Sequence, residues 1–102
     1  MVAVSGTAPI GDDGKTVGVG DAYTQTLRCL EIIEKALQTV GASMSDVIRT
    51  RVFLTDIGVW QDAAKAHGKV FADILPACTF AEVSALINDK WLVEIEADAV
   101  VG

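Results

Sequence analysis

The chain has 102 residues, enough for one domain built around a single hydrophobic core. Fourteen acidic residues against eight basic ones give a net charge of −6, which argues against binding to the phosphate backbone of a nucleic acid. Hydrophobic residues make up 51% of the chain, but no apolar run reaches the roughly 18–20 residues that a membrane span needs.

The first segment predicts a strand followed by turns. The opening "MVAVSG" alternates along its length and ends in glycine, as a short strand does. Residues 7–16, "TAPIGDDGKT", contain the proline, the glycines and the Asp-Gly pair that are typical of tight reversals. The "VGVG" of residues 17–20 is interpreted as a second short strand.

A long helix is predicted from about Asp21 to Val40. Asp21 suits the N-cap, and Gly41 is the residue expected to end the helix in a left-handed conformation. Apolar side chains at three- and four-residue steps form the stripe expected to face the core: Tyr23, Leu27, Leu30, Ile33, Leu37 and Val40.

The run "DVIRTRVFLTD", residues 46–56, is the clearest strand because it is rich in β-branched residues. Alternation predicts one face made of Ile48, Thr50, Val52 and Leu54. The opposite face is then made of Val47, Arg49, Arg51 and Phe53.

A second helix is expected to be capped by Asp56 and to stop before Pro76, which cannot continue a helix. Its predicted core stripe is Trp60, Ala63, Ala64, His67, Phe71 and Ile74. Residues 78–86, "CTFAEVSAL", then predict a strand, "INDK" a turn and "WLVEIEADAVV" the last strand. This order of elements predicts an α+β fold, a mixed sheet with both helices packed on one face.

The last strand raises the main chemical question. Alternation places three carboxylates on one face, those of Glu94, Glu96 and Asp98. The other face receives Val93, Ile95, Ala97 and Ala99. Carboxylates on so apolar a strand must be solvated, paired or used in chemistry. Arg49 and Arg51 are the obvious counter-charges, which favours salt bridges, but a half-buried carboxylate beside another also suits proton transfer near neutrality.

The charged face of the sheet also carries apolar side chains, those of Phe53, Leu92 and Val100, and no further element remains to cover them. A face that is half apolar and half charged is better suited to burial in a subunit interface than to exposure to bulk water. We therefore expect the protein to bind copies of itself through this face.

The two cysteines, Cys29 and Cys78, lack the spacing of a redox or zinc motif. They are expected to be reduced and unbridged, which together with the expected lack of a signal peptide predicts a cytoplasmic protein. His67 is the only histidine, so no metal site is expected. By residue type alone, His67 is interpreted as a core or interface histidine and Cys78 as a small buried hydrophobe.

Four segments in this order resemble the Rid family, the YjgF/YER057c/UK114 group whose best-known members are imine and enamine deaminases. They are "VAVSGTAP", "QTLRCLEIIEKALQTVGASMSDVIRTRVFLTD", "PACTFAEVSAL" and "VEIEADAV", and they make residues 1–102 a single domain of this type. The resemblance implies a chorismate-mutase-like fold assembled as a homotrimer with small-molecule clefts between subunits. It also implies hydrolysis of reactive imines or enamines without a cofactor.

The resemblance further implies roles for single residues. Glu94, the first glutamate of "VEIEA", matches the glutamate that positions water in the family. In "PACT", Cys78 stands where 2-iminoacid deaminases carry an arginine that binds the substrate carboxylate. A neutral thiol cannot replace that guanidinium, so this departure argues against specificity for 2-imino acids. The implied substrate-binding set is Ser5, Gly6, Cys78, Thr79 and Phe80.

Two classes of function therefore remain open on the sequence. In the first, Glu94 orients a water molecule toward an imine or a related polarised carbon in an inter-subunit cleft. In the second, the trimer only binds a small neutral or apolar metabolite, since Cys78 and Phe80 make the cleft less polar than in the deaminases.

Overall fold

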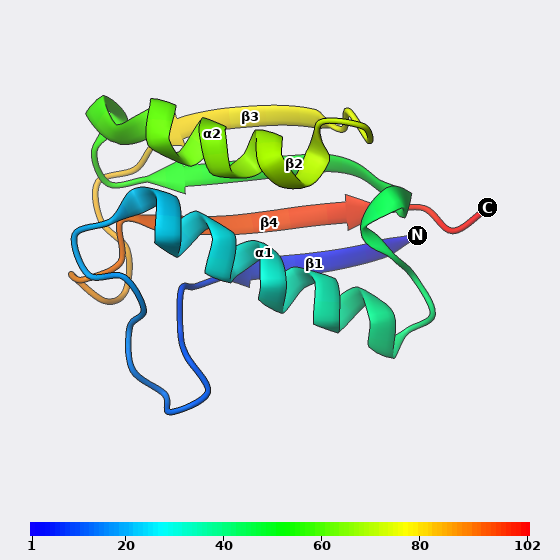
Figure 1. The fold of residues 1–102 in the computed structure, drawn as a ribbon, viewed down its shortest axis with the longest axis horizontal. Coiled ribbons are helices and arrows are strands. Elements are labelled where there is room, and N and C mark those ends of the chain that lie inside the picture. Colours follow the sequence, from blue (N-terminus) through cyan, green and yellow to red (C-terminus); the bar gives the residue numbers. More distant parts are fainter.

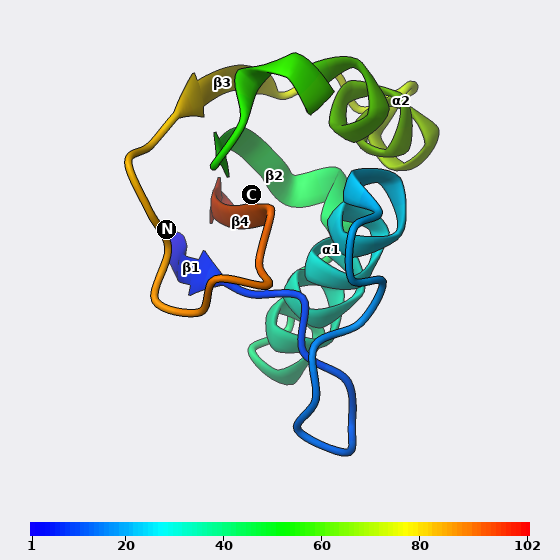
Figure 2. The same ribbon diagram turned by 90° about the vertical axis from the view of Figure 1, so that its left-hand side faces the viewer.

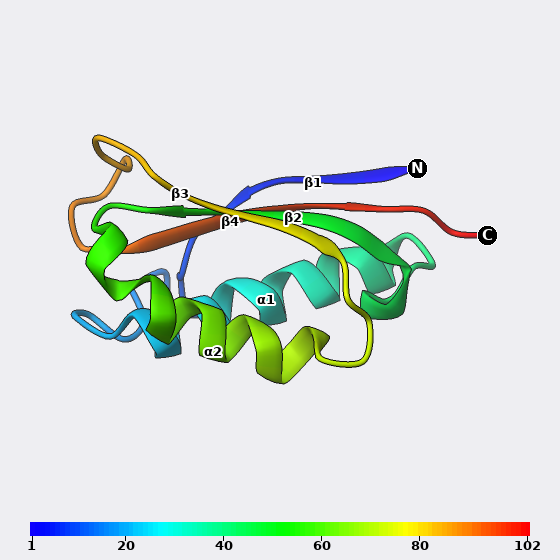
Figure 3. The same ribbon diagram turned by 90° about the horizontal axis from the view of Figure 1, so that it is seen from above.

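The computed structural model describes residues 1–102 as a four-stranded sheet with both long helices on one of its faces (Figures 1 and 3). In chain order the elements are β1 (Val2–Thr7), α1 (Ala22–Thr39), η1 (Met44–Asp46), β2 (Val47–Leu54), η2 (Ile57–Val59), α2 (Trp60–Phe71), β3 (Ala77–Glu82) and β4 (Val93–Ala99). The short elements η1 and η2 are single 3-10 turns. The predicted α+β architecture with a mixed sheet is confirmed.

The strand order across the sheet is β1-β4-β2-β3. β4 is antiparallel to both of its neighbours, whereas β3 is parallel to β2 at the edge. A parallel pair needs a crossover connection, and α2 supplies it. The segment 83–92 then returns from β3 to β4 and bulges out on the helix-free side of the sheet, at the end where β4 begins (Figures 2 and 3).

The hydrophobic core lies between the sheet and the helices. The β4 side chains predicted to point inward are fully buried there: Val93, Ile95, Ala97 and Ala99. They belong to one cluster with Leu30, Ile33 and Leu37 of α1. Neither helix of the protein is both long and apolar enough to cross a lipid bilayer.

Helix α1 begins and ends where the sequence predicts. The Asp21 carboxylate accepts hydrogen bonds from the Thr24 backbone N–H at 3.1 Å and from its hydroxyl at 2.8 Å. These bonds lower the pKa of Asp21. Gly41 follows the helix with φ +80°, a conformation that glycine adopts without strain.

The predicted core stripe of α1 is partly wrong. In the first half of the helix, the buried positions lie one or two residues earlier in the sequence than the predicted ones. Val40 is exposed, and Tyr23 and Leu27 are only half-buried. The buried residues are Ala22, Gln25, Thr26, Cys29, Leu30, Ile33 and Leu37. Two polar side chains, a glutamine and a threonine, thus occupy core positions that an apolar stripe does not reveal.

Strand β2 departs from the predicted alternation at its start. The register with β4 shifts between Val47 and Arg49, so Val47 is buried and Ile48 is 48% exposed, the reverse of the prediction. Such a bulge inserts one unpaired residue and exchanges the two faces beyond it.

Three further predictions are wrong. Residues 17–20 form a bend rather than a strand, with positive φ at both glycines. On α2, Trp60 is 44% exposed and Ala66, which was not in the predicted stripe, is fully buried. β3 ends at Glu82 rather than at residue 86, since its partner β2 ends at Leu54.

Candidate functional site

One face of the sheet has no helix on it (Figure 3). The charged residues of β2 and β4 lie on this face. Arg51 lies opposite Glu96 in the register, and its Nη1 donates to Glu96 Oε1 at 3.1 Å and to Asp98 Oδ2 at 3.2 Å. One guanidinium therefore pairs with two of the three carboxylates. Arg49, the other predicted counter-charge, is exposed and forms no ion pair.

Glu94 is the remaining carboxylate of β4, and it forms no ion pair. It is half-buried and lies in register with Phe53 of β2. Its carboxylate rests against the backbone of Gly6: a Cβ added at Gly6 would lie 2.9 Å from Glu94 Oε2 and 3.1 Å from Cδ. Side chains do not approach a real Cβ so closely. The absence of a side chain at Gly6 therefore provides the space that the Glu94 carboxylate occupies.

A bulge in β1 brings this glycine to Glu94. The register passes from Val4 opposite Ala97 to Thr7 opposite Ile95, so β1 has one residue more than β4 over the same stretch. The Thr7 hydroxyl donates to the carbonyl of Ser5 at 3.0 Å within the bulge. The Ser5-Gly6 pair and Glu94, which the sequence separates widely, are thus neighbours.

Gln25 is a supporting residue that the sequence analysis missed. It is fully buried on α1 and contacts the segment that leads into β4. Its Nε2 donates to the carbonyls of Lys90 at 2.9 Å and Gly18 at 3.3 Å, and its Oε1 accepts from the Leu92 N–H at 2.7 Å. This amide holds the backbone two residues before Glu94. One feature of the sequence could have indicated that Gln25 is buried. It lies one helical turn before Cys29, and cysteine is usually buried.

Strand β3 divides the other predicted binding residues between the two faces of the sheet. Cys78 and Phe80 pair in parallel register with Thr50 and Val52, which are buried under the helices. Paired residues of neighbouring strands point to the same side, so Cys78 and Phe80 lie on the helix side. Thr79 lies between these two residues on the strand, so its side chain points to the helix-free side of the sheet, where Glu94 also lies. One chain therefore does not bring all the predicted residues together.

Beneath Cys78 lies a buried polar pair. Thr50 Oγ1 and His67 Nε2 are 2.8 Å apart, and His67 packs on the Phe71 ring with centroids 4.6 Å apart. Burial lowers the pKa of His67. Burial raises the pKa of the Cys78 thiol, and the neighbouring Thr50 side chain opposes this rise to a smaller extent. His67 is thus a core histidine as predicted.

Cys78 is exposed, so its interpretation as a buried hydrophobe is wrong; it lies on the edge strand β3, which no further strand covers. Cys29 is the buried cysteine of the chain, and both thiols are free, as predicted.

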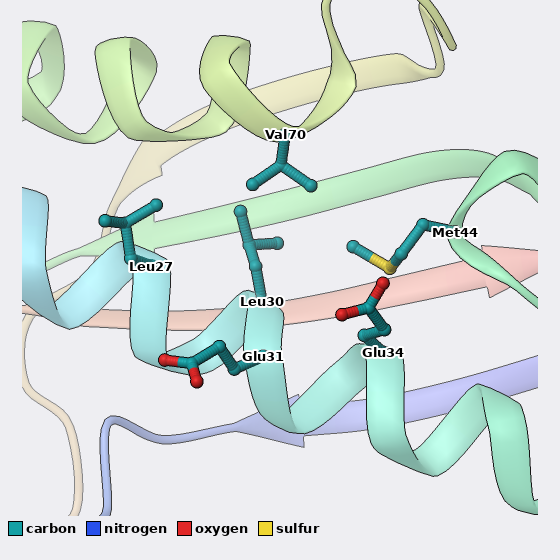
Figure 4. Close-up of a pocket in the computed structure, with 6 residues that line it drawn as sticks. All are labelled: Leu27, Leu30, Glu31, Glu34, Met44 and Val70. Carbon is teal, nitrogen blue, oxygen red and sulfur yellow. The ribbon is translucent and has the colours of Figure 1, made fainter.

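Two apolar hollows lie on the helix side of the molecule. One of about 200 Å³ opens between α1 and α2, where Leu30 and Val70 point toward one another and Glu31 and Glu34 stand at the side (Figure 4). It contains none of the predicted site residues. The other, of about 250 Å³, lies beside Cys78 and His67.

No group of three or more His, Cys, Asp or Glu side chains converges in a way that would hold a metal ion. The chemically available group on the helix-free face is the unpaired carboxylate of Glu94. With the exposed backbone of Ser5 and Gly6 beside it, it can accept a proton from a water molecule and return it to a leaving group.

A family model described as Endoribonuclease L-PSP matches residues 1–101. A RutC family protein from Pyrococcus abyssi is 34% identical over 99 residues, which are 97% of this chain and 77% of that protein.

Solved structures agree with this fold. A member of the YjgF/YER057c/UK114 family from Mycobacterium tuberculosis is 42% identical, with a TM-score of 0.86 over 97% of this chain and 77% of that one. A putative endoribonuclease from Thermotoga maritima is 34% identical, with a TM-score of 0.91 over 98% and 78% of the two chains. Escherichia coli TdcF, solved with bound serine, is 25% identical, with a TM-score of 0.88 over 98% and 80%.

Proposed function

This chain belongs to the Rid family, also called YjgF/YER057c/UK114 or Endoribonuclease L-PSP, and from that premise we propose that it hydrolyses small imines or enamines to carbonyl compounds and ammonia. The observation that supports this most is the state of Glu94. It is the one carboxylate of the β4 row that Arg51 leaves unpaired, and it lies against the backbone of Gly6.

The reaction needs one group that moves a proton twice. Glu94 accepts a proton from water while the water oxygen attacks the imine carbon, and the π electrons of the C=N bond move to nitrogen. The protonated Glu94 returns this proton to the nitrogen, which gives the neutral carbinolamine. Glu94 then takes the proton of the carbinolamine hydroxyl and passes it to the nitrogen, and ammonia leaves as the C=O bond forms. Water and imine become carbonyl compound and ammonia, with no cofactor required. Positioned proton transfer of this kind contributes about 10²–10⁴-fold to a rate.

The substrate is expected to differ from a simple 2-imino acid. Cys78 offers no charge to a carboxylate, and Arg51 is occupied by Glu96 and Asp98. The substrate therefore lacks a carboxylate, or that carboxylate is bound by the unpaired Arg49. The relative TdcF was solved with bound serine, a small metabolite.

Several relatives are named endoribonucleases, but this chain is poorly suited to RNA. Its net charge is −6, and its helix-free face carries three carboxylates beside two arginines, of which Arg51 is already paired. Binding to a nucleic acid backbone rests on cationic side chains that displace counterions. A small neutral metabolite is the better substrate class.

We further propose that three copies assemble through the helix-free face. That face presents Phe53 and Leu92, both half-buried in the single chain, among its charges. A homotrimer would bring Cys78 and Phe80 of one copy near Glu94 of the next, which one chain does not do. In this arrangement Ser5, Gly6, Cys78, Thr79 and Phe80 line the cleft around the catalytic Glu94.

The test compares Glu94→Gln with Glu96→Gln. Both changes remove one charge from the same face of β4, but only Glu94 is unpaired. Imines are generated in the assay, with and without a carboxylate, and ammonia release is followed. We expect Glu94→Gln to lose about 10²-fold or more in rate and Glu96→Gln to stay near wild type. Equal rates for wild type and Glu94→Gln would remove Glu94 from the mechanism.

A second function, binding of a small neutral metabolite without turnover, is favoured by the neutral thiol at Cys78 where an arginine would bind a carboxylate. A ligand that binds the folded state raises its melting temperature. Stabilisation by carbonyl compounds or imines with no ammonia release would select this function over hydrolysis.

A further inference from the structure

We propose that the hollow between α1 and α2 binds a small organic cation, an ammonium group carried on a short apolar chain or ring. The hollow has a volume of about 200 Å³ and contains none of the residues proposed for the hydrolytic site. Both helices lie on the side of the sheet opposite the open face through which the copies would assemble (Figure 3). The proposal therefore does not rest on the proposed hydrolysis, and the hollow stays accessible in a trimer.

The walls of the hollow are apolar and come from two helices and a turn. Leu30 of α1 and Val70 of α2 point toward one another across it, and Leu27 lies three residues before Leu30 on the same face (Figure 4). Met44 of η1 lines the end at which Glu34 stands (Figure 4). Leu27 and Val70 are only half-buried, so the walls still expose apolar surface to water. Covering this surface with an apolar group is therefore favourable.

Two carboxylates stand beside these walls. Glu31 and Glu34 are three residues apart on α1, so their exposed side chains are neighbours on the helix surface. Glu34 forms no ion pair. Glu31 has only a long contact of 4.0 Å to Arg28, whose guanidinium lies closer to Asp12, at 3.2 Å. Like charges at this spacing repel one another, and a cation placed between them would relieve that repulsion.

The two kinds of surface together define the chemical class of the ligand. An ammonium group has three N–H donors and no acceptor, so it can bond to both carboxylates at once. Its apolar chain or ring then lies between Leu30 and Val70. An anion would be repelled by the two glutamates, and a neutral molecule would gain only the apolar contacts.

The size of the hollow limits the size of the ligand. An apolar cavity of about 150 Å³ is large enough for benzene. The hollow of about 200 Å³ therefore takes one ring or a short chain, with the ammonium group at its edge. A protein partner fits less well, because specific interfaces between proteins bury about 800 Å² on each side, which needs a larger surface than this hollow offers.

The test measures binding of phenethylamine, a benzene ring joined to an ammonium group by a short arm, to the native protein at pH 7. Alkylammonium groups are charged at this pH. The methyl groups of leucine, valine and methionine are followed by NMR during a titration. We expect saturable shifts at Leu30, Met44 and Val70, with one ligand bound per chain. Leu92, on the open face, should not shift.

Two further ligands separate the contribution of the charge from that of the ring. Phenethyl alcohol keeps the ring and lacks the charge, and we expect it to bind about fivefold or more weakly than the amine. Ethylamine keeps the charge and lacks the ring, and should give no saturable shift over the same concentrations. Added salt should weaken binding of phenethylamine but not of the alcohol, because salt screens exposed charges.

Two double variants test the glutamates. Glu31→Gln with Glu34→Gln keeps the size of both side chains and removes both charges, so the affinity for phenethylamine should fall about fivefold or more, to that of the alcohol. Asp62→Asn with Asp89→Asn is the matched control, because it removes two charges outside the hollow and should leave the affinity unchanged. All four side chains are exposed, so both double variants are expected to fold.

Equal affinities of the amine and the alcohol for wild type would overturn the proposal, as would an unchanged amine affinity in the double glutamate variant. Absence of saturable shifts at the hollow, or larger shifts at Leu92, would also overturn it. If the methyl groups of the hollow shift with protein concentration alone, another copy of the chain occupies it and the proposal is wrong. Binding is measured without turnover, so its failure leaves the ammonia-release test of Glu94 unaffected.

Discussion

Gly6 and Glu94 illustrate how single residues define the site. The absence of a side chain at Gly6 is what allows the Glu94 carboxylate to lie against the β1 backbone, with 2.9 Å between the position of a Cβ and Oε2. The φ of Gly6 is not in the left-handed region, so its role is space rather than backbone freedom. Substitution there should act on Glu94 and not on the fold.

We predict that Gly6→Ala lowers imine hydrolysis by about 10²-fold, because the new methyl group must push the carboxylate out of its place. The melting temperature should change little. Gly68→Ala is the matched control: it adds the same methyl group on α2, where nothing lies within 4 Å, and should keep wild-type activity. Ammonia release measures both variants, and full activity in Gly6→Ala would show that the carboxylate position is unimportant.

His67 makes stability depend on pH in a predictable direction. Burial lowers its pKa below the ordinary value of 6.5, so the unfolded chain binds a proton more readily than the folded one. The stabilisation from neutral His67 is therefore complete above pH 6.5 and is lost as the pH falls through 6.5 toward the lower folded-state pKa. Denaturant unfolding should give a smaller free energy at pH 5.5 than at pH 7.5.

The variant His67→Phe removes this dependence, since no other histidine exists in the chain. Its unfolding free energy should differ less between the two pH values than that of wild type. A difference as large as in wild type would assign the pH dependence to other groups.

At the scale of the elements, the buried side-chain amide of Gln25 links α1 to the start of β4 through hydrogen bonds. Gln25 bonds to Gly18, Lys90 and Leu92, and so ties the helix to the bend before it and to the start of β4. Replacing it with an apolar residue would leave two backbone groups without partners, the Lys90 carbonyl and the Leu92 N–H, whereas the Gly18 carbonyl keeps its bond from the Asp21 N–H. Such groups cost free energy when they are buried.

We predict that Gln25→Leu lowers the free energy of unfolding by about 2–4 kcal/mol, since leucine fills the space but makes none of the bonds. Gln38→Leu on the same helix is the control: its side chain is exposed and makes no hydrogen bond within the protein, so a change below about 0.5 kcal/mol is expected. Urea unfolding at matched protein concentration measures both. Equal stability of the two variants would contradict a structural role for Gln25.

The elements also explain which features the sequence could predict. The bounds of α1 follow from a cap residue and a terminal glycine, and the two faces of β4 follow from alternation along the strand. Both predictions are confirmed. The bulges at Val47 and before Thr7 were not predictable, because they depend on the register with β4. The same holds for the site: the three carboxylates were visible, but which of them Arg51 leaves unpaired depends on strand pairing.

At the scale of the whole molecule, the sheet has one face covered by α1 and α2 and one face left open (Figure 3). The open face carries Glu94, the Arg51 ion pairs and the half-buried Phe53. The proposed hydrolysis needs a cleft at this face, and one chain supplies only one of its walls. The assembly of copies through this face is therefore the claim on which the site depends.

The molar mass in solution, measured by light scattering on the eluting protein, tests this claim most directly. The account predicts about three times the chain mass of 10.7 kDa, and a shift toward the single-chain mass for Phe53→Glu but not for Val40→Glu at the exposed end of α1. A wild-type mass equal to that of one chain would contradict it, because Glu94 would then face solvent without a second wall.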